Sequence, residues 1–130
     1  MPHAIVEWTD NLERDGFQIR GLLQLINAEM RAAGDAFPIG GIRVRAIKLT
    51  DYVVADGEDD YAFVNITFKI GKGRSDDFKK EFFAALFEKV KAYFAEITAR
   101  RYLALSLYFE ELESPNWKQN NIHAKFKKAN

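Results

Sequence analysis

The stretch Met-Pro-His-Ala-Ile-Val-Glu, residues 1–7, opens the chain, and the rest of the sequence is organised around it. Proline lacks a backbone N–H and is tolerated at the first position of a β-strand, and the apolar run 4–6 after it predicts a mostly buried strand. Methionine is usually removed before a small residue such as Pro2, and its removal would leave a secondary amine able to act as a base. On this stretch alone, the simpler interpretation is favoured, in which Pro2 only starts a strand.

The composition points to one well-packed domain and limits the kinds of partner. The chain has 130 residues, 48% of them hydrophobic, which is enough to bury a core without disulfides or metals. Nineteen basic and nineteen acidic residues give a net charge of zero, so no nucleic-acid partner is indicated. Cysteine is absent, and the two histidines stand at opposite ends of the sequence, which argues against a metal site. With no signal peptide and no apolar run long enough to span a bilayer, we expect a cytoplasmic protein without a membrane partner.

The spacing of apolar residues predicts alternating strands and helices. Period-two alternation predicts strands, and a stripe at three- and four-residue spacing predicts a helix. Gly34 would end the first helix, and Ser75 would cap the start of the second. The elements predicted in this way are a polar loop over 9–17, a helix over 18–33, strands over 42–49 and 61–70, a helix over 75–100 and a strand over 102–109.

Together these elements form two tandem βαβ units. We predict a single α/β (α+β) domain over residues 1–130, with pseudo-repeat halves of about 2–60 and 61–112 and a polar tail over 113–130. Its four-stranded sheet would carry two long helices on one face. Three apolar residues are predicted to anchor the tail: Trp117, Ile122 and Phe126.

The second face of the predicted sheet is too apolar to be left in water. It would expose four residues of the last two strands: Tyr61, Phe63, Ala104 and Tyr108. An exposed patch of this kind usually marks an interface, so the sequence predicts a homo-oligomer.

Two arginines share one face of the strand over 42–49. Charges on strands most commonly mark a solvated edge, and this explanation applies to Arg43 and Arg45. The alternative is a binding pocket, because the guanidinium fork suits carboxylates better than any other side chain.

Several blocks spread over nearly the whole chain are similar to one known family. With its amino-terminal proline and doubled βαβ unit, the sequence resembles the tautomerase superfamily, and within it the 5-carboxymethyl-2-hydroxymuconate Δ-isomerase family. The blocks that carry this resemblance are Pro2-His3, Phe37-Pro38-Ile39-Gly40-Gly41-Ile42-Arg43, Ala55-Asp56-Gly57, Asp60-Tyr61-Ala62-Phe63-Val64, Lys69-Ile70-Gly71-x-Gly73-Arg74-Ser75, Arg101-Tyr102-Leu103-Ala104-Leu105-Ser106 and Lys118-Gln119-Asn120-Asn121.

The resemblance implies a homotrimer that needs no metal or organic cofactor. Its substrate would be a polycarboxylate dienol from homoprotocatechuate (4-hydroxyphenylacetate) degradation, 5-carboxymethyl-2-hydroxymuconate, which it would isomerise to the conjugated keto tautomer. Pro2 would be the catalytic residue, taking the hydroxyl proton and returning a proton to carbon 5. The substrate-binding arginines of the family carry over to Arg43 and Arg74. Arg45 lies on the same strand face as Arg43 and is a further candidate, with structural pairing to a carboxylate as the equal alternative.

Physical chemistry agrees with these roles. Positive charge and partial burial both disfavour an ammonium group, so arginines near Pro2 would lower the pKa of its amine while they hold substrate carboxylates.

Two alternative functions stay open. One is another proline-based tautomerase or related enzyme of the same superfamily, acting on a different carboxylate. The other is a non-enzymatic oligomeric binding protein. Pro2 is a base only if Met1 is removed.

Overall fold

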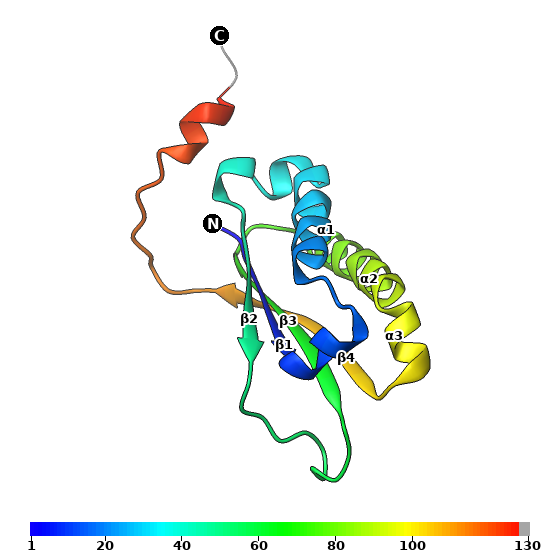
Figure 1. Ribbon diagram of the computed structural model, residues 1–130. Coiled ribbons are helices and arrows are strands. Elements are labelled where there is room, and N and C mark those ends of the chain that lie inside the picture. Colours follow the sequence, from blue (N-terminus) through cyan, green and yellow to red (C-terminus); the bar gives the residue numbers. More distant parts are fainter. Residues whose placement is uncertain (128–130) are drawn as a thin grey trace.

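A computed structural model describes residues 1–127 of the chain as one mixed β-sheet with helices packed on one face (Figure 1). The last three residues of the predicted tail, 128–130, lie outside the described part. The strands are β1 (His3–Thr9), β2 (Arg43–Leu49), β3 (Ala62–Gly71) and β4 (Leu103–Leu112). The helices are α1 (Ile19–Ala32), α2 (Asp76–Tyr93) and α3 (Ala95–Arg100), with short 3-10 turns η1 (Asp10–Asp15), η2 (Gly34–Ala36), η3 (Ile39–Gly41) and η4 (Ile122–Phe126).

The sheet is built from two parallel pairs of strands joined back to back. Its strand order is β2-β1-β3-β4, in which β1 and β2 are parallel, β3 and β4 are parallel, and β1 and β3 are antiparallel. Each parallel pair is connected through a helix, α1 in the first half and α2 followed by α3 in the second. The predicted tandem βαβ fold is therefore confirmed. No helix within residues 1–127 is long and apolar enough to cross a membrane.

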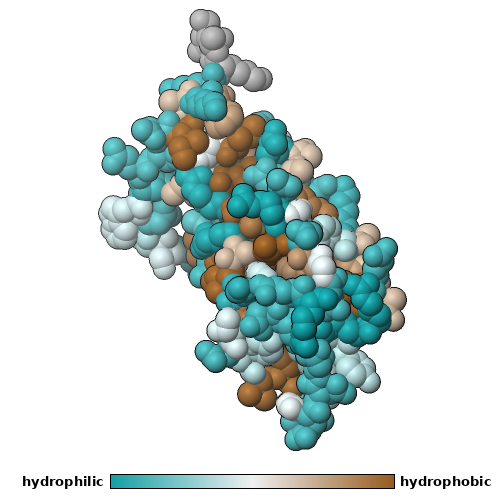
Figure 2. Space-filling view, in the orientation of Figure 1, coloured by the Kyte–Doolittle hydropathy of each residue, from teal (hydrophilic) through white to brown (hydrophobic). Residues whose placement is uncertain are grey.

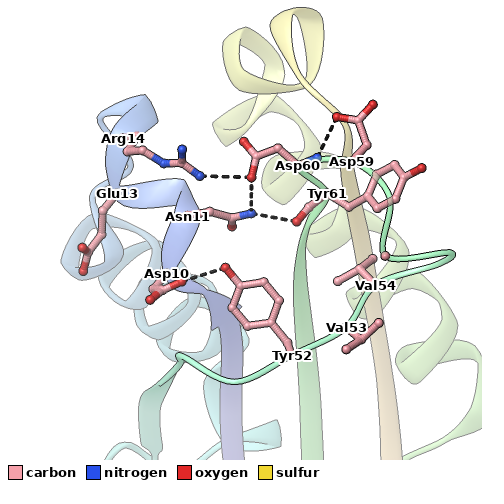
Figure 3. A pocket seen from close by; sticks show the side chains of 11 residues that line it. Asp10, Asn11, Glu13, Arg14, Tyr52, Val53, Val54, Asp59, Asp60 and Tyr61 are labelled. Carbon is pink, nitrogen blue, oxygen red and sulfur yellow. Dashed lines mark hydrogen bonds and ion pairs between the residues drawn. The ribbon is translucent and has the colours of Figure 1, made fainter.

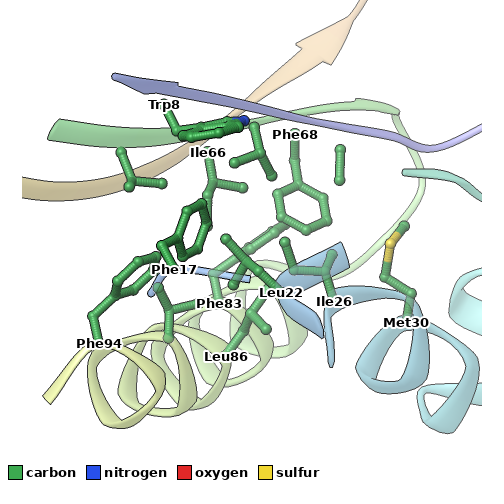
Figure 4. Packing of buried hydrophobic residues seen from close by; sticks show 14 of the residues in the cluster. Trp8, Phe17, Leu22, Ile26, Met30, Ile66, Phe68, Phe83, Leu86 and Phe94 are labelled. Carbon is green, nitrogen blue, oxygen red and sulfur yellow. The ribbon is translucent and has the colours of Figure 1, made fainter. Parts of the chain in front are cut away.

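The core lies between the sheet and the helices, as the periodicity predicts. Along β1, the side chains of Ala4, Val6 and Trp8 are buried, while the alternate residues remain partly exposed. Figure 4 shows Trp8, Ile66 and Phe68 of the sheet facing residues of the helices below them. The helical residues that complete this layer include Leu22, Ile26 and Met30 of α1 and Phe83, Leu86 and Val90 of α2. Burying such side chains contributes roughly 1.5–3 kcal/mol each.

Two predicted segments differ from the structure because of contacts distant in sequence. Residues 10–15 form η1 rather than a loop, since Leu12 enters the core and the Asn11 amide donates to the backbone oxygen of Tyr61 at 2.7 Å. The second long helix does not run unbroken to residue 100. It turns at Phe94, which is completely buried and stacks on Phe17 with ring centroids 5.1 Å apart. The predicted cap is confirmed, because the backbone N–H of Phe78 donates to the Ser75 hydroxyl at 3.1 Å.

The tail does not pack as predicted. Trp117 is 90% exposed and packs on little else in the protomer, whereas Ile122 and Phe126 are 48% and 46% exposed and belong to η4. Instead, the chain leaves β4, passes outside the body and returns beside the amino terminus, where η4 meets η3 (Figure 1). At Gly40 the two segments lie so close that an added Cβ would be only 2.7–2.8 Å from atoms of His123. Only glycine permits this contact without a shift of the segment.

The helix-free face of the sheet is less apolar than predicted. Ala104 and Tyr108 are exposed, but Tyr61 and Phe63 are half-buried. Between them lies a polar chain in which Ser106 donates to the Asn65 side-chain oxygen at 2.7 Å. The predicted apolar patch is therefore interrupted by hydrogen-bonded side chains.

Candidate active site

The amino terminus lies at one end of the sheet, between the η3 turn and the returning C-terminal segment (Figure 1). Pro2 is buried at the start of β1, and its carbonyl oxygen accepts a hydrogen bond from the backbone N–H of Arg43 at 3.0 Å. Because β1 and β2 are parallel and His3 pairs with Arg43, the amino terminus and the first residue of β2 lie at the same end of the sheet.

Arg43 is held by backbone carbonyls rather than by an acid. Its Nη1 donates to the oxygens of Gly40 and Ile42 at 3.1 and 2.9 Å, and its Nη2 lies 3.7 Å from the sulfur of Met1. Among the ion pairs found within residues 1–127, none involves Arg43. Its charge is therefore available to a ligand.

Arg74 reaches the same end of the sheet from the turn after β3. Its Nε donates to the oxygen of Ala36 at 2.8 Å, its Nη1 donates to the oxygen of Gly71 at 2.9 Å, and its guanidinium lies 4.7 Å from the centre of the Phe37 ring. Burial lowers the pKa of Arg74, and the negative charge of Glu111 opposes this effect. Glu111 itself is bound by Lys79 at 2.6 Å, so Arg74 is positioned without a carboxylate in direct contact.

These cations act together on the terminal amine. Burial lowers the pKa of this amine below its ordinary value of 8.0, and the charges of Lys118, Arg74 and Arg43 lower it further, in that order. This amine belongs to Met1, one residue before the Pro2 nitrogen that would become the terminal amine after removal of Met1. A lowered pKa raises the fraction of unprotonated amine near neutral pH, which is what a base requires.

Arg45 is separated from this group. Its Nη1 lies 2.9 Å from Nδ1 of His3, on the helix-free face of the sheet. Burial and then the charge of Arg45 lower the pKa of His3, and Arg45 is not among the groups that act on the amine. Its partner is an imidazole rather than the carboxylate considered in the sequence. The structure therefore brings Arg43 and Arg74 to the amino terminus and leaves Arg45 beside His3.

The C-terminal segment adds two residues that received no role in the sequence analysis. Lys118 is the first of the charges that lower the pKa of the amine. Asn120 donates its side-chain amide to the oxygen of Gly40 at 2.8 Å, the carbonyl that Arg43 also uses. Both lie in the block 118–121, which is one of those similar to the isomerase family, and this was the only signal for them in the sequence.

The opposite end of the sheet has a hollow of different character (Figure 3). Figure 3 shows the Asn11 amide between Asp60 and the backbone of Tyr61, and the Tyr52 hydroxyl donating to Asp10 at 2.7 Å. Carboxylates dominate the lining, so an anionic ligand would be repelled there. Within residues 1–127, no group of three or more histidine, cysteine or acidic side chains could hold a metal ion.

Comparison with known proteins identifies the family of the chain. The family model of 5-carboxymethyl-2-hydroxymuconate isomerase matches residues 2–126. The chain is 44% identical over 128 residues to the 5-carboxymethyl-2-hydroxymuconate Delta-isomerase of Escherichia coli, covering 98% of this chain and 100% of that protein.

Solved structures extend the match to the fold. A 5-carboxymethyl-2-hydroxymuconate isomerase from Deinococcus radiodurans R1 superposes with a TM-score of 0.91 at 43% identity, covering 98% of this chain and 95% of the other. A second 5-carboxymethyl-2-hydroxymuconate delta-isomerase gives a TM-score of 0.88 at 26% identity, covering 100% and 95%. More distant structures, at 13–19% identity and TM-scores of 0.51–0.61, share the fold alone. With a family model matched over almost its whole length and a relative of 44% identity, the chain belongs to the 5-carboxymethyl-2-hydroxymuconate isomerase family.

Proposed function

We propose that this chain converts 5-carboxymethyl-2-hydroxymuconate to its conjugated keto tautomer, with the amine of Pro2 as the base. The observation that carries the proposal is that Arg43 and Arg74 lie at the amino-terminal end of the sheet, fixed by backbone carbonyls, with the N–H of Arg43 bonded to the carbonyl oxygen of Pro2 at 3.0 Å. The E. coli relative supports the choice of substrate, because its name is that of an isomerase of this compound.

The chemistry needs one proton carrier. The Pro2 amine takes the proton of the 2-hydroxyl group, the electrons of that O–H bond form the ketone, and the double bonds shift along the dienol. The ammonium then returns a proton to carbon 5, so atoms and charge balance. Arg43 and Arg74 bind carboxylates of the substrate, and contacts near the forming ketone stabilise enolate charge as it develops. Arg45 is retained only as a weaker candidate for binding, because its guanidinium is beside His3.

The test begins with the mass of the amino terminus, because a retained Met1 makes the Pro2 nitrogen an amide without a basic lone pair. The processed protein is then assayed with 5-carboxymethyl-2-hydroxymuconate and, in parallel, with the enol of phenylpyruvate. We expect a higher kcat/KM for the muconate. Faster turnover of phenylpyruvate would move the assignment to another tautomerase, and no turnover of either would favour a binding protein.

We further propose that the protein assembles as a homotrimer. Strand β4 is a long edge strand of ten residues, and several apolar side chains on it and in the segment after it are exposed: Tyr108, Phe109, Leu112 and Trp117. Figure 2 shows hydrophobic patches interspersed among hydrophilic atoms on the face it displays. Unpaired strand edges and exposed apolar side chains both favour association. Sedimentation equilibrium should give three times the mass of the chain, and a stable monomer would contradict the proposal. The predicted cytoplasmic location stays a prediction from the sequence.

A further inference from the structure

The orientation of the Asn120 side chain is fixed by its own surroundings. Its Oδ1 accepts a hydrogen bond from the backbone N–H of Ile122 at 2.8 Å. The amide nitrogen must therefore point the other way, and its two N–H groups have different partners. One donates to the oxygen of Gly40 at 2.8 Å, and the other faces the sulfur of Met1 at 3.6 Å.

Arg43 uses the same two partners. Its Nη1 donates to the oxygen of Gly40 at 3.1 Å, and its Nη2 faces the sulfur of Met1 at 3.7 Å. A thioether sulfur is only a weak acceptor, so neither donor is well satisfied there. The side chain of Met1 thus fills a space beside the terminal amine that is bordered by two strong donor groups.

Removal of Met1 would empty this space. The proposed function requires that removal, and it leaves the free N–H groups of Arg43 and Asn120 directed at the vacated position. We propose that Asn120 is a further substrate-binding residue, which donates a hydrogen bond to the carboxylate that Arg43 binds. This inference rests on the proposed function and adds a contact from the C-terminal segment to it.

The segment that carries Asn120 is held in place independently of any ligand. His123 packs directly on the backbone of Gly40, at a distance that excludes any Cβ there. The N–H of Ala124 also donates to the oxygen of Asn121 at 3.3 Å, which closes the start of η4. A donor fixed in this way loses little conformational entropy when a ligand binds.

The test compares Asn120→Asp with Asn121→Asp in processed protein. Aspartate at 120 keeps the acceptor for Ile122 but replaces two donors with a negative charge. Asn121 is exposed and its side chain makes no capping bond, so it provides the same charge change one residue away. We expect Asn120→Asp to raise KM and the Kd of cis,cis-muconate, a dienedicarboxylate without the hydroxyl group, by about 10- to 100-fold. Asn121→Asp should change both by less than about twofold.

A purely structural role for Asn120 predicts different results. His123→Ala loosens the same segment without removing the amide, so equal losses in His123→Ala and Asn120→Asp would overturn the proposal. The side-chain amide signal of Asn120, assigned by its loss in Asn120→Asp, should shift during titration with cis,cis-muconate. An unshifted signal, or unchanged muconate binding in Asn120→Asp, would also overturn it. Failure of the proposed function is separate, because it would appear as full activity in a chain whose Pro2 nitrogen is blocked.

Discussion

Arginines at the two ends of the sheet have opposite surroundings. At the amino-terminal end, Arg43 and Arg74 donate to backbone oxygens and meet no carboxylate within ion-pair distance among the described residues. At the other end, Arg101 binds Asp15 at 2.8 Å and Asp60 at 3.2 Å. The same residue type thus stabilises the fold at one end, where its charge is neutralised, and acts on the amine at the other, where it is not.

The difference has a physical basis. A carbonyl oxygen fixes the direction of a guanidinium but carries no net charge, so the positive potential around it persists. That potential disfavours the ammonium form of a nearby amine and attracts carboxylates. A carboxylate partner removes both effects. Substitutions at the amino-terminal end should therefore change mainly activity, and substitutions at the other end should change mainly stability.

Blocking the amine should have the largest effect. Inserting one serine between Met1 and Pro2 turns the proline nitrogen into an amide, and the loss of a general base should lower kcat by about 10²–10⁴-fold. The control is the same insertion between Gly57 and Glu58, in an exposed loop at the other end of the sheet. Steady-state kinetics checks both, and near-normal turnover in the blocked chain would rule out the amine as the base.

Removing the paired arginine should change stability instead. The Arg101 side chain is only 10% exposed, and Arg101→Ala leaves Asp15 with only the longer contact to Arg100 at 3.7 Å, so it should lower the free energy of unfolding by about 2–3 kcal/mol. Arg14→Ala, which breaks an exposed pair with Asp60, should cost less than about 1 kcal/mol. Urea denaturation measures both. The distinction between the two ends would be lost if Arg101→Ala also lowered the kcat/KM of the folded protein by about tenfold or more.

Removing either unpaired arginine should lower activity more than it lowers stability. We expect Arg43→Ala and Arg74→Ala each to lower kcat/KM about 10- to 100-fold, since each loses a charged hydrogen bond to the substrate. The change in unfolding free energy should stay below that of Arg101→Ala. Comparing kinetics and urea denaturation of the three variants tests this pattern. Large losses of stability with unchanged kcat/KM would mean that these arginines are structural.

Much of the fold was predictable because its signals are local. The alternation in β1, the stripe of α1 and the cap at Ser75 each depend on neighbouring residues. The incorrect predictions concern distant contacts, such as the Asn11 amide bonding to Tyr61 and the Phe94 ring stacking on Phe17. Periodicity contains no information about partners so far along the chain.

The candidate site was predictable only in part. Arg43 and Arg74 are candidates from motifs in the sequence, and the structure places both at the amino-terminal end of the sheet, where their charges contribute to the lowered pKa of the Met1 amine. Arg45 could not be separated from Arg43 by sequence, because its partner His3 is on another strand. Lys118 and Asn120 received no role from the sequence, because their surroundings are distant in the chain: Asn120 bonds to a carbonyl 80 positions away, and Lys118 acts on the amine of residue 1.

The central claim is that unpaired cations lower the pKa of the terminal amine. It is tested most directly by following the ¹⁵N chemical shift of Pro2 against pH in the processed protein. We expect its pKa to lie below that of the amine in a short peptide that begins with the same residues, Pro2-His3-Ala4. Removing a positive charge makes the ammonium form less unfavourable, so the pKa should rise in both Arg43→Ala and Arg74→Ala. Because the base works only when unprotonated, the loss of activity on acidification should then begin at a higher pH. A pKa equal to or above that of the peptide, unchanged in both variants, would contradict the account.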